Sequence, residues 1–296
     1  NAAPSPPPPI PPPCPSPRPD PPPPATPAHT AVARALGNPE NYCFTNALIQ
    51  VFMTIPRLRE KWSHAPSPWS CIAQKYVSGG QPVLDNPGLL QRMDSWFEVP
   101  HERQCAHECL MHVLDDTVGI TGDFFRIVCH ELYQAHAAAA VARRRAIHRC
   151  LAMPIPAKSV AEGLALFTSV THPNPNQLDA RHTTTIHRGA PCIFFSVQRC
   201  TWSGLNHRLT RSTREFAYPW SLEGVTGFSA AYVLQAAVIH VGSALKGHYT
   251  AYVRHQNTWD YCNDGSVVPS TRAEALSQTR NVYLLLYTNI ASIEQL

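Results

Sequence analysis

The chain lacks any C-x-x-C pair, although its 296 residues include ten cysteines. Cysteines scattered singly are typical neither of a disulfide framework nor of a tetrahedral zinc site, and they fit a reducing compartment in which most thiols simply fill space. We therefore expect no cofactor and no metal site. Between about 120 and 190 the chain has only the single cysteines Cys129 and Cys150 and several histidines, and a zinc site of Cys129, His130, His136 and Cys150 is the combination left open.

Long apolar runs and blocks of like charge are also missing. No stretch approaches the roughly 18 to 20 apolar residues that a membrane helix needs, and the N-terminus lacks a secretory layout of basic and then apolar residues. Charged residues make up 15% of the chain and the formal net charge is +4. This mild charge, densest in RRR at 143–145, does not favour nucleic acid as a partner. We expect a soluble, cytoplasmic protein with no membrane partner.

Proline, in contrast, is abundant at the N-terminus, where it makes up more than half of the first 30 residues. Proline fixes φ and has no amide N–H, so we expect residues 1–30 to form a disordered, extended linker. The linker is either a plain tether or a docking segment for SH3-type or WW-type modules. A globular domain follows over 31–290, with a C-terminal tail at 291–296.

The period of the apolar residues changes within the globular part. Spacing typical of helices predicts a helix over 43–55, before Pro56. The same spacing predicts helices over 86–97, with Asn86 as a cap, and over about 104–117. An alanine-rich segment predicts a fourth helix over about 129–149. A capping box of Ser159 and Glu162 predicts a short fifth helix from Ser159. After about 190 the period becomes 2 and predicts five strands: 192–199, 232–241, 248–255, 258–263 and 281–288. Helices followed by antiparallel strands predict an α+β fold, with a cleft where the two halves meet.

Cys43 is the first candidate for chemistry, because it stands at the start of the predicted 43–55 helix. The positive end of the helix dipole favours the thiolate there and lowers the pKa of the thiol. Buried free cysteine is also common and inert, so position alone leaves a packing role open. A cysteine nucleophile needs a base.

His248 is the candidate base, because it follows Gly247 at the start of a predicted strand and can reach a thiol on a facing helix. His240, on the preceding strand, is the alternative. A catalytic imidazole also needs a partner on its other nitrogen, and Asn263 and Asp264 lie at the end of the next strand. Neighbouring strand residues point to opposite faces, so only one of the two can orient His248. Both also suit an ordinary Asn-Asp-Gly turn.

Asn38 lies five residues before Cys43, on the loop that enters the predicted helix. Its side-chain amide can stand beside the backbone amide of Cys43, where an acyl-transfer site needs donors for the oxyanion. Asn38 also fits a plain loop before Pro39.

Taken in order, these segments resemble the ubiquitin-specific protease family. The family's cysteine box, L-x-N-x-G-N-T-C-Y-x-N-S-x-x-Q, is matched by LGNPENYCFTNALIQ at 36–50, its histidine box by YVLQAAVIHVGSALKGHYTAYVR at 232–254, and its W-x-x-F-N-D motif by WDYCND at 259–264. Two further blocks are matched by RQCAHECLMHVLDD at 103–116 and by PCIFFSVQRCTW at 191–202 followed by REFAYPWSL at 214–222. The resemblance covers roughly 31–289.

The resemblance implies a papain-like fold with a helical thumb and an antiparallel β palm. It implies thiol-dependent hydrolysis of the bond after the C-terminal Gly-Gly of ubiquitin or a ubiquitin-like modifier, with conjugates of these proteins as partners. The implied catalytic roles are Cys43 as nucleophile, His248 as base, Asn263 as its orienting partner and Asn38 as oxyanion donor; the implied substrate-binding residues are Gln104, Glu108, Gly247 and Tyr249.

Several departures from the family pattern favour a second hypothesis, a catalytically weak ubiquitin-binding scaffold. Glu40 replaces the usual glycine of the cysteine box, next to Pro39. Cys105 replaces the aspartate that is implied to grip the arginine-rich tail of ubiquitin, and Arg103 stands where glutamine is common. The family's zinc-bearing fingers are expected to be reduced or lost, because their two C-x-x-C pairs are absent.

A third hypothesis concerns the origin of the chain. Residue 1 is Asn rather than Met, so we expect a fragment or a product cut from a precursor. A compact domain behind a polyproline spacer suits a viral polyprotein, which the protease would process in the host cytoplasm while also removing ubiquitin from host proteins in immune evasion.

Overall fold

The computed structural model describes residues 33–38, 41–78, 87–97, 104–134, 141–154, 156–168, 181–204, 207–228 and 231–293. In this part of the chain the first elements are helices: α1 (Cys43–Met53), α2 (Pro56–His64), α3 (Ser70–Ser78), α4 (Pro87–Asp94), α5 (Ala106–Asp116) and α6 (Val118–Phe125). The helices predicted over 43–55, 86–97 and 104–117 are confirmed with shorter bounds. The sequence patterns do not predict α2, α3 or α6. The expectations for residues 1–30 and for Asn86 lie outside the described residues.

Helix α1 is the central helix of the domain, because every one of its residues is buried. It packs on β10 on one side and on α5 on another. The helix stops at Thr54, whose N–H donates to the carbonyl oxygen of Val51. Pro56 then begins α2, a position that needs no amide N–H. Cys43, the first residue of α1, is thus held at one end of a tightly packed element.

The largest sheet runs in the order β12-β11-β10-β9-β13-β5-β3, with β8 paired to β9. Its strands are β3 (Cys150–Met153), β5 (Cys192–Val197), β8 (Ser221–Leu222), β9 (Tyr232–Gly242), β10 (Gly247–His255), β11 (Thr258–Asn263), β12 (Ser266–Ser270) and β13 (Val282–Asn289). Neighbours are antiparallel except for β3 and β5. All five predicted strands are present, so the expected antiparallel half is confirmed.

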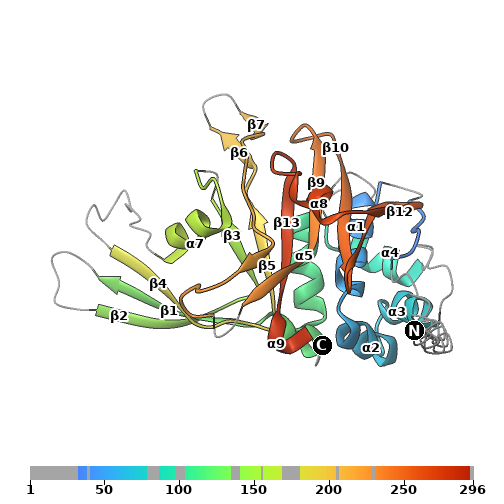
Figure 1. The fold of residues 1–296 in the computed structure, drawn as a ribbon, viewed down its shortest axis with the longest axis horizontal. Coiled ribbons are helices and arrows are strands. Elements are labelled where there is room, and N and C mark those ends of the chain that lie inside the picture. Colours follow the sequence, from blue (N-terminus) through green and yellow to red (C-terminus); the bar gives the residue numbers. More distant parts are fainter. Residues whose placement is uncertain are drawn as a thin grey trace, which may run out of the picture. The chain divides into compact units, whose positions relative to one another are not determined.

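A second, three-stranded sheet consists of β1 (Ile127–Gln134), β2 (Val141–His148) and β4 (Arg181–Arg188), in the order β2-β1-β4. These strands extend away from the larger sheet (Figure 1). The predicted helix over 129–149 is therefore wrong. The family's finger module was expected to be reduced in this segment; a sheet occupies it, without the C-x-x-C pairs.

The burial pattern of β1 explains why a sheet forms there. Cys129 and its cross-strand partners Ala146 and Ile186 are buried, whereas His130 and its partner Arg145 are exposed. The neighbouring residues 129 and 130 therefore lie on opposite faces, as in a strand. Its partner β4 lies about 50 residues further along the chain, so local sequence carries no sign of the pairing.

The remaining elements are helices α7 (Val160–Thr168), α8 (Arg272–Leu276) and α9 (Ile290–Ile293) and the hairpin strands β6 (Cys200–Ser203) and β7 (Arg208–Arg211). The helix predicted from Ser159 is confirmed as α7, and the N–H of Glu162 donates to Oγ of Ser159 at 3.1 Å. The Glu162 carboxylate accepts from the N–H of Lys158 instead of Ser159, so only half of the predicted capping box forms.

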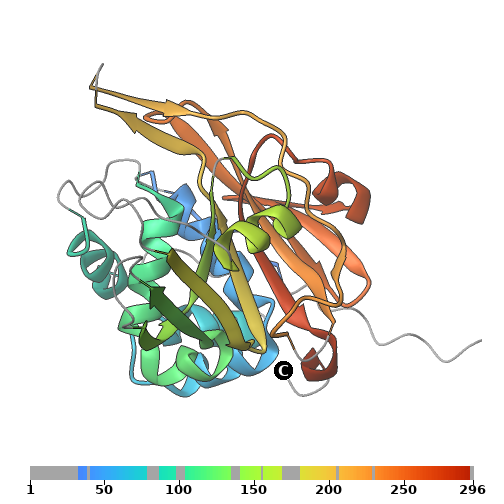
Figure 2. The same cartoon turned by 90° about the vertical axis from the view of Figure 1, so that its left-hand side faces the viewer.

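Two hydrophobic cores lie on opposite faces of the larger sheet. One contains side chains of α1 to α6 together with residues of β9, β10 and β13. The other contains side chains of α7 and α8 with the opposite face of the same strands, and Figure 2 shows the two groups of helices on either side. This arrangement places the start of α1 next to the sheet strands that carry His248 and Asn263. In the ranges given above, no helix is long and apolar enough to cross a bilayer.

Candidate active site

The imidazole of His248 is hydrogen-bonded to the side chain of Asn263. His248 is the second residue of β10, and Asn263 is the last residue of β11, the neighbouring strand. Nε2 of the ring lies 2.7 Å from Oδ1 of the amide. Because a carbonyl oxygen can only accept, Nε2 carries the hydrogen and donates it. The neutral ring is thereby held in the tautomer whose Nδ1 can take up a proton.

The side chain of Asp264 is close to His248 but is hydrogen-bonded to other residues. Its Oδ2 is 3.8 Å from Nε2 of His248, beyond hydrogen-bonding distance. The carboxylate accepts a hydrogen bond from Nδ2 of Asn38 at 2.9 Å and another from Nδ2 of Asn46 at 2.7 Å. Asp264 also has a left-handed φ of 45°, in the turn that leads to β12. Of the two candidates for orienting His248, Asn263 therefore makes the direct contact.

Asn38 connects the same turn to the start of α1. Its Oδ1 accepts a hydrogen bond from the backbone N–H of Tyr42 at 2.6 Å, while its Nδ2 donates to Asp264. The backbone N–H of Leu36 donates to the carbonyl oxygen of Asp264 at 2.9 Å. The loop ahead of α1 is thus bound to the turn after β11 by side-chain and backbone contacts. Cys43 directly follows Tyr42 at the end of this loop.

Cys43 lies at the first position of α1 with only 4% of its surface exposed. Helix α1 packs along β10 and lies beside it in Figure 1. The side chain of His248 is 44% exposed. We therefore expect a substrate to reach the thiol from the side of His248. The predicted residues thus come from α1, its preceding loop, β10 and β11, which the fold brings together.

His240, the alternative base, is buried among aromatic rings. Its ring stacks on Tyr249 with 4.4 Å between centroids and lies 5.8 Å from Tyr283. Burial first, and then the charges of Arg211 and His248, lower the pKa of His240 to about 4. A ring with this pKa is neutral near pH 7 and accepts protons poorly. Its surroundings favour a packing role over a role as the base.

Gly247 allows the ring of His240 to approach the start of β10. A Cβ at position 247 would lie 1.9 Å from Nε2 of His240, which is too close for any side chain. Gly247 pairs with Gly242, which has a left-handed φ of 125°. The glycine that was predicted to contact substrate therefore also has a packing reason to be glycine, immediately before His248.

The other predicted substrate-binding residues differ in how much of their surface is exposed to solvent. Tyr249 is 7% exposed and packs edge-on against Tyr283, with 5.5 Å between ring centroids. Gln104 is half-buried just ahead of α5. Glu108 is exposed in the first turn of α5. Glu108 is therefore the best placed of the three to meet a large partner.

Cys105 presents an uncharged group at the start of α5, where the resemblance implies an aspartate. Its Sγ lies 3.0 Å from the hydroxyl oxygen of Tyr283, so one of the two groups donates a hydrogen bond to the other. The departures at Pro39, Glu40 and Arg103 lie outside the described residues and stay predictions.

Two contacts of the site are not predicted from the sequence. Asn46 matches the cysteine box, but its hydrogen bond to Asp264 is not evident from that match. The hydroxyl of Tyr42 donates to Oδ1 of Asp94 in α4 at 2.8 Å. The signal for Asn46 is its position three residues after Cys43, which puts both side chains on neighbouring parts of the first turn.

The cysteines in the described ranges are free thiols. Over the same ranges, no group of three or more Cys, His, Asp or Glu side chains could hold a metal ion. Cys129 is buried and His130 is exposed, on alternate positions of β1. His136 lies outside the described residues, and the expected absence of a metal site stays a prediction.

Comparison with known proteins assigns the chain to a family. The family model described as ubiquitin carboxyl-terminal hydrolase matches residues 34–287. The chain is 35% identical over 79 residues to ubiquitin carboxyl-terminal hydrolase 11 of Schizosaccharomyces pombe, covering 27% of this chain and 22% of that protein. It is 46% identical over 55 residues to ubiquitin carboxyl-terminal hydrolase nonstop of Drosophila melanogaster, covering 18% of this chain and 11% of that protein.

These matches span only about a fifth and a tenth of the two relatives' lengths. The family match, in contrast, covers most of the chain and contains the segments around Cys43, His248 and Asn263. The predicted α+β fold, of the papain-like type with helices before an antiparallel sheet, is thereby confirmed. The chain belongs to the ubiquitin carboxyl-terminal hydrolase family.

Proposed function

We propose that the protein is a thiol-dependent hydrolase that cleaves the isopeptide or peptide bond after the C-terminal Gly-Gly of ubiquitin or a ubiquitin-like modifier. The main support is the contact between His248 and Asn263, because it fixes the tautomer of an imidazole at the head of the strand that packs against α1. Cys43 begins that helix. Conjugates of ubiquitin or of a related modifier are the proposed partners.

In the proposed reaction Nδ1 of His248 takes the proton of the Cys43 thiol. The thiolate attacks the carbonyl carbon, and a bond forms between Sγ and that carbon while the carbonyl oxygen becomes an oxyanion. Asn263 accepts the hydrogen bond from Nε2 throughout, so the ring stays in position as it becomes positively charged.

The oxyanion is stabilised by two donors at the start of α1. The side-chain Nδ2 of Asn38 has two hydrogens, and Asp264 accepts one of them. The second hydrogen is the proposed donor to the oxyanion, together with the backbone N–H of Cys43. Asp264 therefore acts as a positioning residue, since it sets the direction of the Asn38 amide.

The tetrahedral intermediate then breaks its C–N bond. The leaving amine takes the proton from His248, and a thioester joins Cys43 to the modifier. Water attacks the thioester with His248 again accepting a proton, and the thiol is released. Glycine at both positions before the bond suits a channel that offers little room, because a side chain there would collide with its walls.

The scaffold hypothesis has one supporting observation. Cys105 offers no charge to a basic tail and is instead engaged by Tyr283. Weak recognition of the tail would then leave binding of the modifier's body as the main activity. Polyprotein processing, immune evasion, a host cytoplasmic location and docking of SH3-type or WW-type modules stay predictions from the sequence.

Hydrolysis of di-ubiquitin and of ubiquitin-like conjugates by the full chain tests the proposed function. We expect the wild-type protein to cleave at least one of these substrates and Cys43→Ala to cleave none. Cys71→Ala removes a half-buried thiol of α3 far from the site in sequence and serves as the control, with wild-type activity expected. Folded wild-type protein that binds ubiquitin and cleaves nothing would support the scaffold instead.

A further inference from the structure

A cavity of about 320 Å³ lies between α6 and the three-stranded sheet. Three arginines line it, Arg126, Arg145 and Arg188, together with His187 and one acid, Asp123. Arg126 follows the end of α6, Arg145 lies in β2, and Arg188 is the last residue of β4. The fold therefore gathers these arginines from three separate elements. We call this site the arginine cavity.

The exposed face of the three-stranded sheet leads into the arginine cavity. His130 lies opposite Arg145, and Val128 lies opposite Arg188, so the members of each pair share a face. The rings of His130 and His187 stack with 4.5 Å between centroids. Cys129, Ala146 and Ile186, on the opposite face of the sheet, are buried. Arg145 and Arg188 thus lie on a face of the sheet that is open to a ligand.

In the described part of the chain, the guanidinium groups of Arg126, Arg145 and Arg188 have neither a hydrogen bond nor an ion pair. The carboxylate of Asp123 lies 3.6 Å from Nζ of Lys61, which offsets part of its charge. Three arginines against one partly paired acid leave an excess of positive charge on the walls of the cavity.

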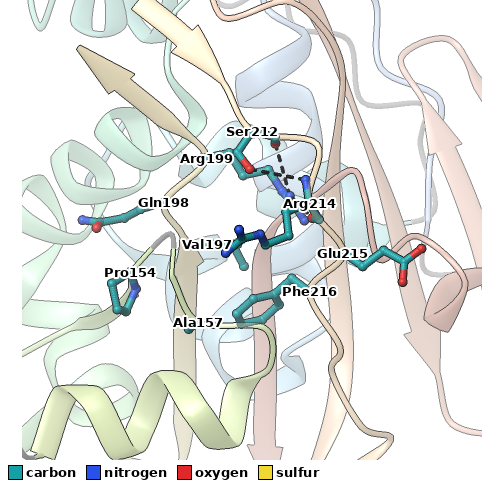
Figure 3. A pocket seen from close by; sticks show the side chains of 9 residues that line it. All are labelled: Pro154, Ala157, Val197, Gln198, Arg199, Ser212, Arg214, Glu215 and Phe216. Carbon is teal, nitrogen blue, oxygen red and sulfur yellow. Dashed lines mark hydrogen bonds between the residues drawn. The ribbon is translucent and has the colours of Figure 1, made fainter. Parts of the chain in front are cut away.

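Arg199 has a structural role, and its surroundings differ from those of the three arginines in the arginine cavity. Its guanidinium is buried beside a cavity of only about 10 Å³ and donates to the carbonyl oxygens of Ser212 and Arg214 (Figure 3). Two further carbonyl oxygens, those of Val282 and Thr279, accept from the same group. The contrast indicates that the three arginines of the larger cavity are available to an external anion.

The arginine cavity is separate from the candidate active site. Tyr232, at the start of β9, donates to the carbonyl oxygen of Ala190, beside the cavity. Gly242, at the other end of β9, pairs with Gly247, beside His248. A strand of 11 residues spans roughly 30 Å, so the two sites lie at opposite ends of the sheet.

We propose that the arginine cavity binds a small polyanion carrying two or more phosphoryl groups. Guanidinium groups bind phosphate oxygens through paired, charge-assisted hydrogen bonds, and a volume near 320 Å³ is that of a small-ligand site. The carboxyl end of α6 and Asp123 add negative charge to one wall, so a singly charged ion gains little. A hollow lined by three arginines from separate elements favours a compact anion over an extended strand of nucleic acid.

Titration calorimetry of the full chain with sodium tripolyphosphate tests this proposal. We expect one binding site per chain and an affinity that falls steeply with added NaCl. Arg126→Gln combined with Arg188→Gln should weaken binding by about 100-fold, because each lost charge-assisted contact accounts for about 10-fold. Arg57→Gln combined with Arg208→Gln removes the same charge from exposed positions outside the cavity and should change the affinity by less than about 2-fold.

Arg145→Gln alone should weaken tripolyphosphate binding by about 10-fold and keeps the test valid if the double variant folds poorly. A hexaglutamate peptide is the second ligand, and we expect it to bind more weakly than tripolyphosphate. Equal weakening by the two double variants would overturn the proposal, as would absence of tripolyphosphate binding by the wild-type chain. Tighter binding of hexaglutamate would also overturn it, since the site would then recognise an acidic protein segment. All these outcomes are independent of hydrolase activity.

Discussion

Asn46 in the first turn of α1 donates a hydrogen bond from Nδ2 to Oδ1 of Asp264, across a distance of 2.7 Å. This contact joins the helix that begins with Cys43 to the turn that follows Asn263. Together with the Asn38 contact, it sets the position of α1 relative to the strands β10 and β11. The distance between the proposed nucleophile and the proposed base therefore depends on an acid that takes no proton in the proposed reaction.

Asp264→Asn should lower kcat for ubiquitin hydrolysis by about 10-fold to 100-fold, with KM changed by less than about 2-fold. The substitution replaces an oxygen that accepts from Asn38 or Asn46 with an amide nitrogen that cannot accept. Steady-state kinetics with a fluorogenic ubiquitin substrate measure the effect. Asp116→Asn, which removes an acid that pairs with Arg92 on the surface of α5, is the control. A raised KM at unchanged kcat would contradict a positioning role.

Asn263→Ala should reduce kcat/KM by about 100-fold or more, because Nε2 of His248 loses its partner and the ring is no longer held in one tautomer. Asn263→Asp should retain more activity than Asn263→Ala, since a carboxylate also accepts from Nε2. The pH–rate profile of the aspartate variant should shift to higher pH, because the added charge favours the imidazolium. Equal activity of Asn263→Ala and wild type would exclude Asn263 as the orienting residue.

Gly247→Ala should abolish most of the activity, because the new methyl group would overlap the ring of His240 and move the start of β10. Combining it with His240→Ala removes the clash and should recover part of the loss. The two substitutions should therefore be clearly non-additive in a double-mutant cycle on kcat/KM. Additive losses would show that Gly247 acts through something other than the space for His240.

Acid should destabilise the fold through His240. Its pKa is lowered to about 4 in the folded protein from an ordinary value of about 6.5, so the unfolded chain binds more protons between these values. The free energy of unfolding then rises with pH across this window and falls as the pH drops from about 6.5 toward 4, by up to about 3 kcal/mol.

Urea unfolding at pH 7 and at pH 4.5 measures the change in stability. His240→Gln has no titrating ring, so its stability should differ less between the two pH values than that of the wild-type chain. A pH dependence that the substitution leaves unaltered would assign the acid sensitivity to other groups.

The sequence predicts the parts of the fold whose signals are local. The local pattern of apolar residues is enough to find α1 and all five predicted strands, because the apolar residues that each element buries lie within its own length. The prediction for 129–149 is wrong because alanines favour a helix, whereas β1 pairs with β2 and also with β4, which follows only after residue 180. Pairing at that separation leaves no mark in the local pattern.

The sequence patterns propose members of the candidate site but do not predict the contacts between them. Alternation along β11 implies that only one of Asn263 and Asp264 can orient His248, yet the choice depends on the left-handed turn at Asp264 and on its amide partners. The sequence marks Arg145 only as part of the basic run at 143–145, because the fold alone brings it together with Arg126, after α6, and Arg188, at the end of β4.

The most direct test of the central claim is covalent labelling with ubiquitin that carries a C-terminal thiol-reactive electrophile, followed by mass mapping of the modified residue. We predict a single adduct on Cys43, lost in Cys43→Ala and strongly slowed in His248→Ala. Folded wild-type protein that forms no adduct, or an adduct that persists in Cys43→Ala, would contradict the assignment of Cys43 as the nucleophile.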